Sequence, residues 1–239
     1  MSGHSKWSKI QHKKGKADKA RSNLFTKLSR AVTVAAQQGG SDPEMNFSLR
    51  LAIDKAKEGN VPKENIERAI KKGTGELDGG ATIQEIIYEG YGPHGVAVLV
   101  ETLTDNTNRT VSEIKHVFNT YGGSLGTPGS VQWQFQNLGV IRIASTKIQN
   151  SDLELEFIDA GVDDIVESEE GVEIICSKEN LRGIMEILKE KNIVPDDSGL
   201  EWVTKEMIEL DEQKSQSLEK LEDALDDLDD VGAVYTNEA

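Results

Sequence analysis

The chain has 239 residues, of which 36% are hydrophobic, and this composition supports folded domains with real cores. No apolar run of about 18 residues is present to span a membrane, and the first residues contain no apolar stretch typical of a signal peptide. We therefore expect a cytoplasmic protein with no membrane partner. Cys176 is the only cysteine, which excludes an internal disulfide and a multi-thiolate zinc site.

Charge is distributed very unevenly along the chain. The formal net charge is −15, yet residues 1–73 hold 16 Lys and Arg against 7 Asp and Glu, a net of +9. Residues 74–239 hold 11 against 35, a net of −24. Such an asymmetry indicates a basic module that meets a polyanion and an acidic body that is repelled by it. The interpretation fails if the protein's own carboxylates already neutralise those cations.

The amino-terminal third is predicted to be a basic arm followed by a three-helix bundle. Residues 1–20 are expected to be flexible, because six lysines and a single acid lie between Lys6 and Lys19. The bundle is expected over residues 21–78. Its helices are predicted over Asp18–Gly39, Asp42–Gly59 and Pro62–Gly73. The second helix is expected to have Asp42 as its N-cap. Its expected buried residues are Met45, Leu49, Ala52, Ile53 and Ala56.

The rest of the chain is predicted to form two α+β domains. One comprises residues 79–136 plus 206–239, and the other is inserted into it at residues 137–205. The elements expected in the first are a hairpin of Ile83–Tyr91 and Val96–Thr104, a helix over Asp105–Tyr121, a strand through Val131, Trp133 and Phe135, a long acidic helix with a leucine stripe, and a last strand over Gly232–Tyr235.

The inserted segment has the order β-α-β-β-α-β, which is the ferredoxin-like pattern. Its strands centre on Ile141, Ile165, Ile174 and Trp202, and its helices run near Ser151–Ala160 and Glu179–Asn192. Cys176 falls in an apolar strand and is expected to be an inert core residue. The predicted fold class is therefore multidomain α+β, with an N-terminal three-helix bundle and two α+β domains, one ferredoxin-like and inserted in the other.

Several long segments agree in order and spacing with a known family. These are GHSKWSKIQHKKGKADKARSNLFTKLSR, NVPKENIERAIKKGTGE, YEGYGPHGVAVLVE, LTDNTNRTVSEIKHVF and GSVQWQF. Together they resemble the YebC family, whose mitochondrial relatives include the translational activator of cytochrome c oxidase. The resemblance implies a three-helix domain followed by two α+β domains. It implies either a DNA-binding transcriptional regulator or a ribosome-associated factor that helps difficult peptides such as proline runs through synthesis.

The candidate nucleic-acid contacts are mostly cations of the arm and bundle, which can neutralise phosphates. Trp7 can stack on an exposed base, and His12 is a polar contact rather than a metal ligand. The candidates are Lys6, Trp7, Lys9, His12, Lys13, Lys14, Lys16, Lys19, Arg21, Lys27, Arg30, Lys63, Arg68, Lys71 and Lys72. Secondary candidates at a predicted helix start are Asn106, Asn108 and Arg109, although capping by Asp105 or Thr107 explains that start equally well.

Other motifs favour structural roles. On the third helix, Glu64 with Arg68 and Glu67 with Lys71 have the spacing of ordinary surface pairs, so contact and structural roles both stay open there. The glycine loop 122–130 has backbone amides that could hold an anion, but it lacks the lysine of a phosphate loop, which favours a structural turn. No helix presents a clear row of residues suited to base edges.

No catalytic motif emerges, so we predict a non-enzymatic, monomeric nucleic-acid-binding regulator without cofactor or metal. The resemblance favours DNA and transcription. The residues themselves favour RNA, because a lysine arm with one tryptophan needs only phosphate and stacking contacts. The partner is thus DNA, ribosomal RNA or transfer RNA, with the ribosome or the transcription machinery in addition. A third hypothesis is a protein-interaction adaptor that uses the acidic ferredoxin-like face.

Overall fold

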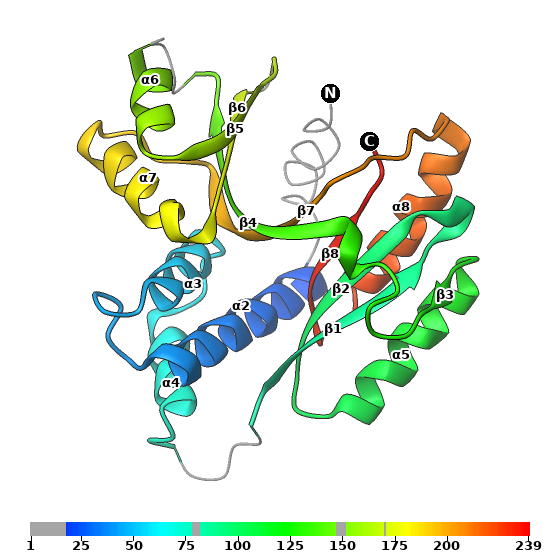
Figure 1. Cartoon of the computed structure of the whole chain (residues 1–239). Helices are drawn as coiled ribbons and strands as arrows, with labels where there is room; N and C mark the ends of the chain where they lie inside the picture. The colour runs from blue at the N-terminus through cyan, green and yellow to red at the C-terminus, as the bar shows by residue number, and fades with distance from the viewer. Residues whose placement is uncertain (1–17, 78–81, 147–151, 170) are drawn as a thin grey trace. The chain divides into compact units, whose positions relative to one another are not determined.

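The structure, a computed structural model, describes residues 18–77, 82–146, 152–169 and 171–239 (Figure 1). The side chains of residues 18–21 and 152–155 lie outside this description. Phe135–Lys205 forms one compact unit, and the described part of Lys16–Gln134 together with Glu206–Glu238 forms the other. The predicted α+β class is confirmed, because helices come first and two antiparallel sheets follow.

Helices α2 (Asp18–Gly39), α3 (Phe47–Glu58) and α4 (Lys63–Gly73) pack together as predicted. Apolar residues at helical spacing supply their shared core. The buried members of that core are Val32, Ala35, Ala36, Leu49, Ala56, Val61, Ile66 and Ala69. From Val32 to Ala36 every residue of α2 is buried, because α3 and α4 contact this helix and strands β2 and β8 contact it as well.

The start of α3 differs from the prediction. Asn46, not Asp42, is the N-cap, and its Oδ1 accepts a hydrogen bond of 3.0 Å from Leu49 N. Its Nδ2 donates to the backbone oxygens of Ala35 and Gly40, at 2.7 and 3.0 Å, so the cap is tied to the end of α2. Residues 43–45 therefore form a turn, and Met45, expected in the core, is 83% exposed.

A four-stranded antiparallel sheet follows, in the order β3-β1-β2-β8. Its strands are β1 (Gln84–Tyr91), β2 (Ala97–Thr104), β3 (Ser124–Leu125) and β8 (Val231–Thr236). The predicted hairpin is confirmed, with β1 paired to β2 along its whole length. The turn between them, η2 (Pro93–Gly95), uses positive φ at His94 and Gly95, which suits the tight reversal.

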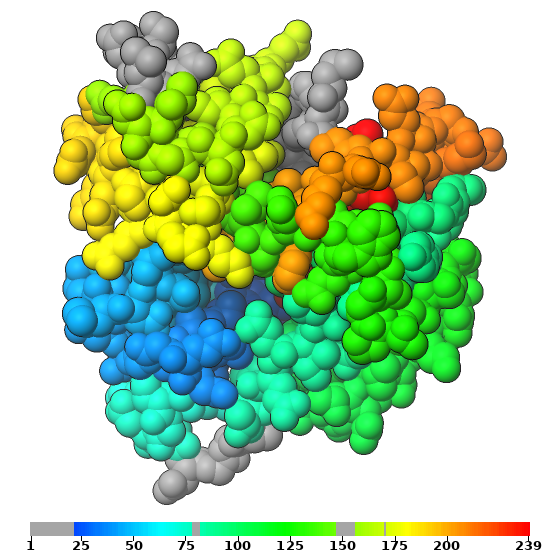
Figure 2. Space-filling view, in the orientation of Figure 1, coloured from blue at the N-terminus to red at the C-terminus, as the bar shows by residue number. Residues whose placement is uncertain are grey.

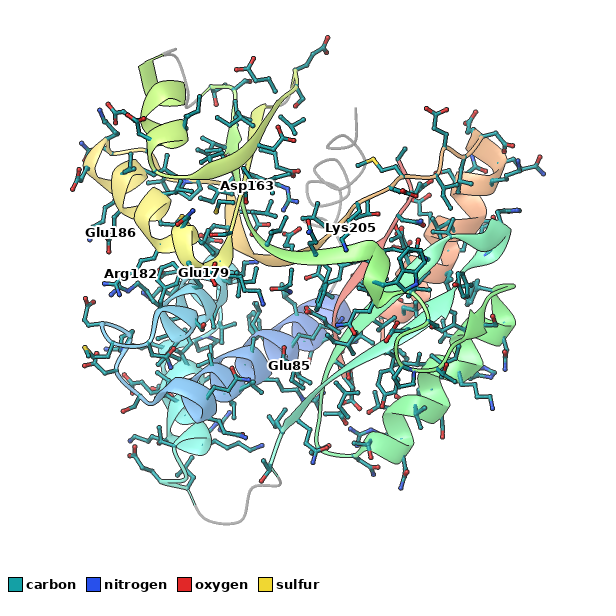
Figure 3. All side chains as sticks on the ribbon, viewed as in Figure 1. Glu85, Asp163, Glu179, Arg182, Glu186 and Lys205 are labelled. Carbon is teal, nitrogen blue, oxygen red and sulfur yellow. The ribbon has the colours of Figure 1, made fainter. Side chains whose placement is uncertain are left out.

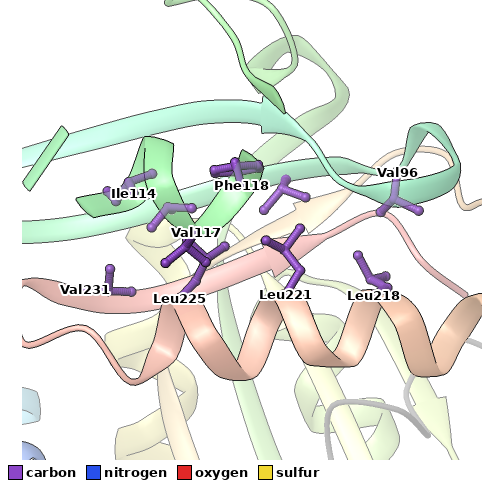
Figure 4. Close-up of a cluster of buried hydrophobic side chains, with 10 residues drawn as sticks. Val96, Ile114, Val117, Phe118, Leu218, Leu221, Leu225 and Val231 are labelled. Carbon is purple, nitrogen blue, oxygen red and sulfur yellow. The ribbon is translucent and has the colours of Figure 1, made fainter. Parts of the chain in front are cut away.

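Helices α5 (Thr107–Thr120) and α8 (Glu212–Asp226) supply the apolar residues that pack against this sheet (Figure 4). The leucine stripe predicted for the last helix is intramolecular packing: Leu218, Leu221 and Leu225 are fully buried. They lie beside Ile114 and Phe118 of α5 in the same cluster. The acidic C-terminal helix and strand thus complete the core that the hairpin begins.

The strand predicted through Val131, Trp133 and Phe135 is wrong in its first half. Residues 132–134 form a short helix, η3 (Gln132–Gln134), and strand β4 (Phe135–Ala144) begins only afterwards. Trp133 is 66% exposed. The physical reason is that the backbone N–H groups of Val131 and Gln132 donate to the Glu89 carboxylate, which leaves them unavailable to a strand ladder.

The unit Phe135–Lys205 has the predicted ferredoxin-like order. After β4 come α6 (Asp152–Asp159), β5 (Val162–Glu167), β6 (Gly171–Cys176), α7 (Lys178–Glu190) and β7 (Asp197–Thr204), and the sheet order is β5-β6-β4-β7. Helix α7 contacts β4 and carries an exposed Arg182–Glu186 pair of 3.0 Å (Figure 3). Arg142 is buried in this unit and is held by Glu201 at 2.7 Å, with Glu173 and Asp197 close by.

Candidate nucleic-acid interface

Helix α4 carries the exposed cations of the bundle that the sequence singled out, and its surface forms part of the blue-to-cyan region in Figure 2. Lys63 pairs with Glu67 at 3.6 Å, and Arg68 donates to Asn65 Oδ1 at 3.1 Å. The predicted pairs Glu64–Arg68 and Glu67–Lys71 are therefore wrong. The i,i+4 pair forms one residue earlier, from Lys63 to Glu67, and Arg68 bonds to Asn65 instead of Glu64.

A cleft of about 620 Å³ lies between α2 and α4. Asn65, Arg68 and Lys72 line it from α4, at the spacing of one helix face. The lining contributed by α2 is rich in hydroxyl groups, from Ser22, Thr26, Ser29 and Thr33, and it also includes Phe25 and Arg30. The cleft thus combines cations, hydroxyls and one aromatic ring.

Two of the predicted contact residues are already engaged by carboxylates. Lys27 Nζ donates to the backbone oxygen of Asp226 and lies 3.7 Å from that residue's Oδ1. Arg30 donates from Nη1 to the Asp230 carboxylate and to the backbone oxygen of Asp229. These two cations join α2 to the end of α8 and the start of β8, so they serve packing within the protein rather than an open basic surface.

Arg109 is the third predicted contact with an internal partner. Its guanidinium reaches Asp230 Oδ2 at 2.7 Å and Asp105 Oδ1 at 3.0 Å, and these bonds raise the pKa of Arg109. Asn106 proves to be the N-cap of α5, where capping by Asp105 or Thr107 was expected, and its Oδ1 accepts from Arg109 N at 3.2 Å. Among the three secondary candidates, Asn108 is exposed, and in the described part of the chain only its side chain has no hydrogen bond or ion pair.

Asp230 is the centre of this arrangement, and its side chain is only 2% exposed. Thr110 Oγ1 and Thr104 Oγ1 donate to its Oδ2 at 2.7 and 3.1 Å, in addition to the two arginines. Burial alone would raise the pKa of Asp230, but the hydrogen bonds from Thr110, Arg109 and Arg30 outweigh it and hold the pKa below its usual range. The carboxylate therefore stays ionised at neutral pH.

The glycine loop 122–130 does hold an anion, and the anion is the protein's own. The backbone N–H groups of Gly129, Val131 and Gln132 all donate to the carboxylate of Glu89, which is buried on β1. Burial raises the pKa of Glu89, and these three hydrogen bonds reverse the effect and lower it. Because these three N–H groups already donate to Glu89, they are not available to bind a phosphate. This agrees with the structural role predicted for the loop.

The remaining candidates fall partly outside the described residues. Lys6, Trp7, Lys9, His12, Lys13, Lys14 and Lys16 lie outside the described ranges, and only the backbone of Lys19 and Arg21 is described, as the first turns of α2. Nowhere in the described part do three or more His, Cys, Asp or Glu side chains gather so as to hold a metal ion. None of the described helices has the length and apolar character required to cross a bilayer.

Sequence reasoning missed the α2 wall of the cleft. Ser22, Thr26, Ser29 and Thr33 recur at spacings of four, three and four, which places their hydroxyls on one helix face. That spacing is a signal visible in the sequence alone. The charged residues of the same helix, Lys27 and Arg30, are a stronger signal for nucleic-acid binding, and their internal partners lie about 200 residues further along.

Comparisons with known proteins agree over almost the whole chain. Residues 5–76 match the TACO1/YebC protein N-terminal domain, and residues 83–238 match the TACO1/YebC second and third domain. A probable transcriptional regulatory protein of Thermoanaerobacter pseudethanolicus is 47% identical over 99% of this chain and 96% of its own length. Another of that name, from Dehalococcoides mccartyi, is 48% identical over 90% of this chain and 85% of its own.

A solved structure shows the same fold. The crystal structure of a conserved hypothetical protein from Aquifex aeolicus superposes with a TM-score of 0.88 at 42% sequence identity. The match covers 98% of this chain and 97% of the other.

Proposed function

This chain belongs to the TACO1/YebC family, and on that premise we propose that it is a non-enzymatic regulator of gene expression that binds nucleic acid and acts in transcription. Several relatives carry the name probable transcriptional regulatory protein at about 47% identity. Their names support transcription as the process. The nucleic-acid contact itself is argued from the charges of this chain.

The observation that carries the proposal is the separation of available and engaged cations. Lys27, Arg30 and Arg109 are satisfied by internal carboxylates, so they leave the contact surface. Arg68 and Lys72 instead face a cleft, and of the six lysines from Lys6 to Lys19 five precede α2 in the sequence and the last lies in its first turn. Because residues 74–239 have a net charge of −24, we expect a polyanion to approach residues 1–73 and not the remainder of the chain.

One observation favours a second candidate, an RNA-binding translation factor associated with the ribosome. The available cations of α4 line a concave cleft, whereas sequence-specific duplex readers insert a protruding helix into the major groove. A cleft suits unpaired strands, which are common in structured RNA. This alternative keeps the same residues and changes only the target.

Crosslinking in cells, followed by sequencing of both the bound DNA and the bound RNA, separates these functions. Enrichment of promoter DNA is expected for the transcriptional role. Enrichment of ribosomal or transfer RNA without promoters would refute transcription and support the alternative. If neither DNA nor RNA is recovered above background, nucleic-acid binding is refuted altogether. The remaining hypothesis is then the protein-interaction adaptor that uses its acidic face.

A charge-reversed arm provides the internal check on this experiment. Lys13, Lys14 and Lys16 are replaced by glutamate in one variant, which is expected to lose most of the crosslinked material. The matched variant makes the same change at Lys115, Lys178 and Lys189, which are exposed lysines of the acidic part. Equal loss in both variants would show that overall charge, not the basic arm, controls binding.

A further inference from the structure

We propose that the cleft between α2 and α4 is a binding site for a single strand of nucleic acid, with phosphates on the α4 wall and sugars or bases on the α2 wall. This inference rests on the proposed function and adds to it a site and a strand chemistry. The site comprises Phe25, Thr26 and Ser29 of α2 and Asn65, Arg68 and Lys72 of α4.

The α4 wall is organised for an anion. Asn65, Arg68 and Lys72 share one helix face, and the acids of the same helix, Glu64 and Glu67, do not line the cleft. Within the described part of the chain, the guanidinium of Arg68 donates only to the neutral amide oxygen of Asn65, at 3.1 Å. Lys72 is exposed and has no hydrogen bond or ion pair among the described residues. Two cations four residues apart can reach neighbouring phosphates of one strand.

The lining of the cleft contains no carboxylate among the described residues. Its three cations are Arg30, Arg68 and Lys72, and Arg30 is already bound to Asp230 at one end. Gln38 of α2 donates to Glu85 of β1 at 3.1 Å (Figure 3), and neither residue lines the cleft. The charge of the site therefore complements an anionic backbone.

The α2 wall supplies contacts suited to the rest of a nucleotide. Thr26 donates its hydroxyl hydrogen to Ser22 O at 3.1 Å, which leaves the Thr26 oxygen free to accept. The Ser29 hydroxyl has no hydrogen-bond partner among the described residues and can donate or accept. A ribose 2′-OH both donates and accepts, so it can bond to such a pair. Phe25 is partly buried against the core of the bundle and also lines the cleft, so a base can pack against its ring.

Shape favours one strand over a duplex. A concave site of about 620 Å³ can admit a few nucleotides of an unpaired strand. A duplex is read by an element that enters its groove, about 12 Å wide, whereas Arg68 and Lys72 line a cleft. The combination of a basic groove and an aromatic side chain is typical of single-strand binding.

The test measures binding of the full chain to three fluorescein-labelled probes: a 12-nucleotide oligouridylate, the corresponding oligodeoxyuridylate and a duplex of the same length. The cleft variant is Arg68→Glu with Lys72→Glu. Its matched control is Lys115→Glu with Lys220→Glu, which makes the same charge change at exposed positions of the same unit, outside the cleft lining and outside the candidate contacts. A third variant, Thr26→Glu, places a carboxylate on the opposite wall at an exposed position.

The cleft variant and Thr26→Glu are expected to weaken single-strand binding about tenfold, while the control changes it by less than about threefold. Loss of two phosphate contacts lowers the salt slope of a single strand by about 1.4. Tighter binding of oligouridylate than oligodeoxyuridylate would identify the 2′-OH as part of the recognition, and equal binding would assign the site to the shared phosphate backbone.

Equal effects in the cleft and control variants, or no effect in either, would overturn the cleft site while leaving nucleic-acid binding by the arm intact. Preferential loss of duplex binding in the cleft variant would overturn the single-strand assignment. Absence of binding by the unmodified chain to all three probes would instead defeat the proposed function. Circular dichroism and thermal unfolding of each variant confirm that the comparison is made between folded proteins.

Discussion

Asp230→Asn is expected to destabilise the unit that contains the bundle, because this carboxylate joins α2 to α5 and β8. In the wild type it accepts hydrogen bonds from Arg30, Arg109, Thr104 and Thr110 while its side chain is 2% exposed. Asparagine has the same shape, but it has no charge and turns an NH₂ group toward donors. Removing one partner of a fully buried ion pair costs about 3 to 5 kcal/mol.

The expected value lies at the low end of that range. The Arg109 side chain is 41% exposed and that of Arg30 is 20% exposed, so water can solvate both guanidinium groups once the carboxylate is lost. The hydroxyl oxygens of the two buried threonines lie 2.7 Å apart, so Thr110 can donate its hydrogen to Thr104 Oγ1 once the carboxylate is lost. We therefore expect a loss of about 3 kcal/mol of unfolding free energy.

Urea unfolding followed by circular dichroism, with hydrogen exchange of peptides from α5 and β8, measures this loss in the relevant unit. At a slope of about 2 kcal/mol per molar urea, the midpoint should fall by about 1.5 M. Asp229→Asn is the matched control, because it removes the same charge from the neighbouring exposed position and should cost less than about 0.5 kcal/mol. Equal midpoints for the two variants would refute the assigned role of Asp230.

Three further predictions concern ionisation and packing. The folded-state pKa of Asp230 is lowered, so its contribution to stability is complete above the unfolded pKa of about 3.9 and is lost as the pH falls through the folded pKa. Urea unfolding at a series of pH values should therefore show a constant difference in unfolding free energy between wild type and Asp230→Asn from about pH 7 to 5. This difference should narrow below about pH 4. Burial, with the charge of Asp163 added, raises the pKa of Cys176 to about 11, so a disulfide reagent at about pH 8 should label the native protein slowly and the urea-unfolded protein at once; rapid native labelling would contradict its place in the core. Gly73→Ala should cost about 1 to 3 kcal/mol of unfolding free energy, because the added Cβ would overlap the Thr33 carbonyl oxygen where α4 packs on α2. Gly183→Ala, which meets open space on α7, should stabilise the protein by about 0.5 to 1 kcal/mol. Thermal unfolding measures both variants, and equal shifts of their midpoints would contradict this reasoning.

Much of the fold could be predicted because periodic apolar residues dominate the regular elements. Helix α2 has the predicted bounds, and the order of the ferredoxin-like unit agrees strand for strand. The N-cap of α3 was missed because Asp42 and Pro43 are a good local start signal. Asn46 displaces them through bonds to Ala35 and Gly40, which are tertiary contacts that local preference does not contain.

Two other differences have the same origin. The alternation of Val131, Trp133 and Phe135 resembles a strand, but a carboxylate from β1 takes the backbone N–H groups that the strand would need. Lys27 and Arg30 look like surface cations beside a basic arm, and only the return of the chain at Asp226 and Asp230 shows that they are paired. Pairings across about 200 residues are invisible to local patterns.

The most direct test of the account is the affinity of the full chain for a labelled nucleic acid across a salt series from about 50 to 200 mM. Six to eight phosphate contacts, from the lysines of the arm and the two cations of the cleft, predict a slope of log affinity on log salt of about −4 to −7. The Lys13, Lys14 and Lys16 charge reversal should reduce the slope by about 2 to 3. An affinity that does not change with salt would contradict the proposed electrostatic contact.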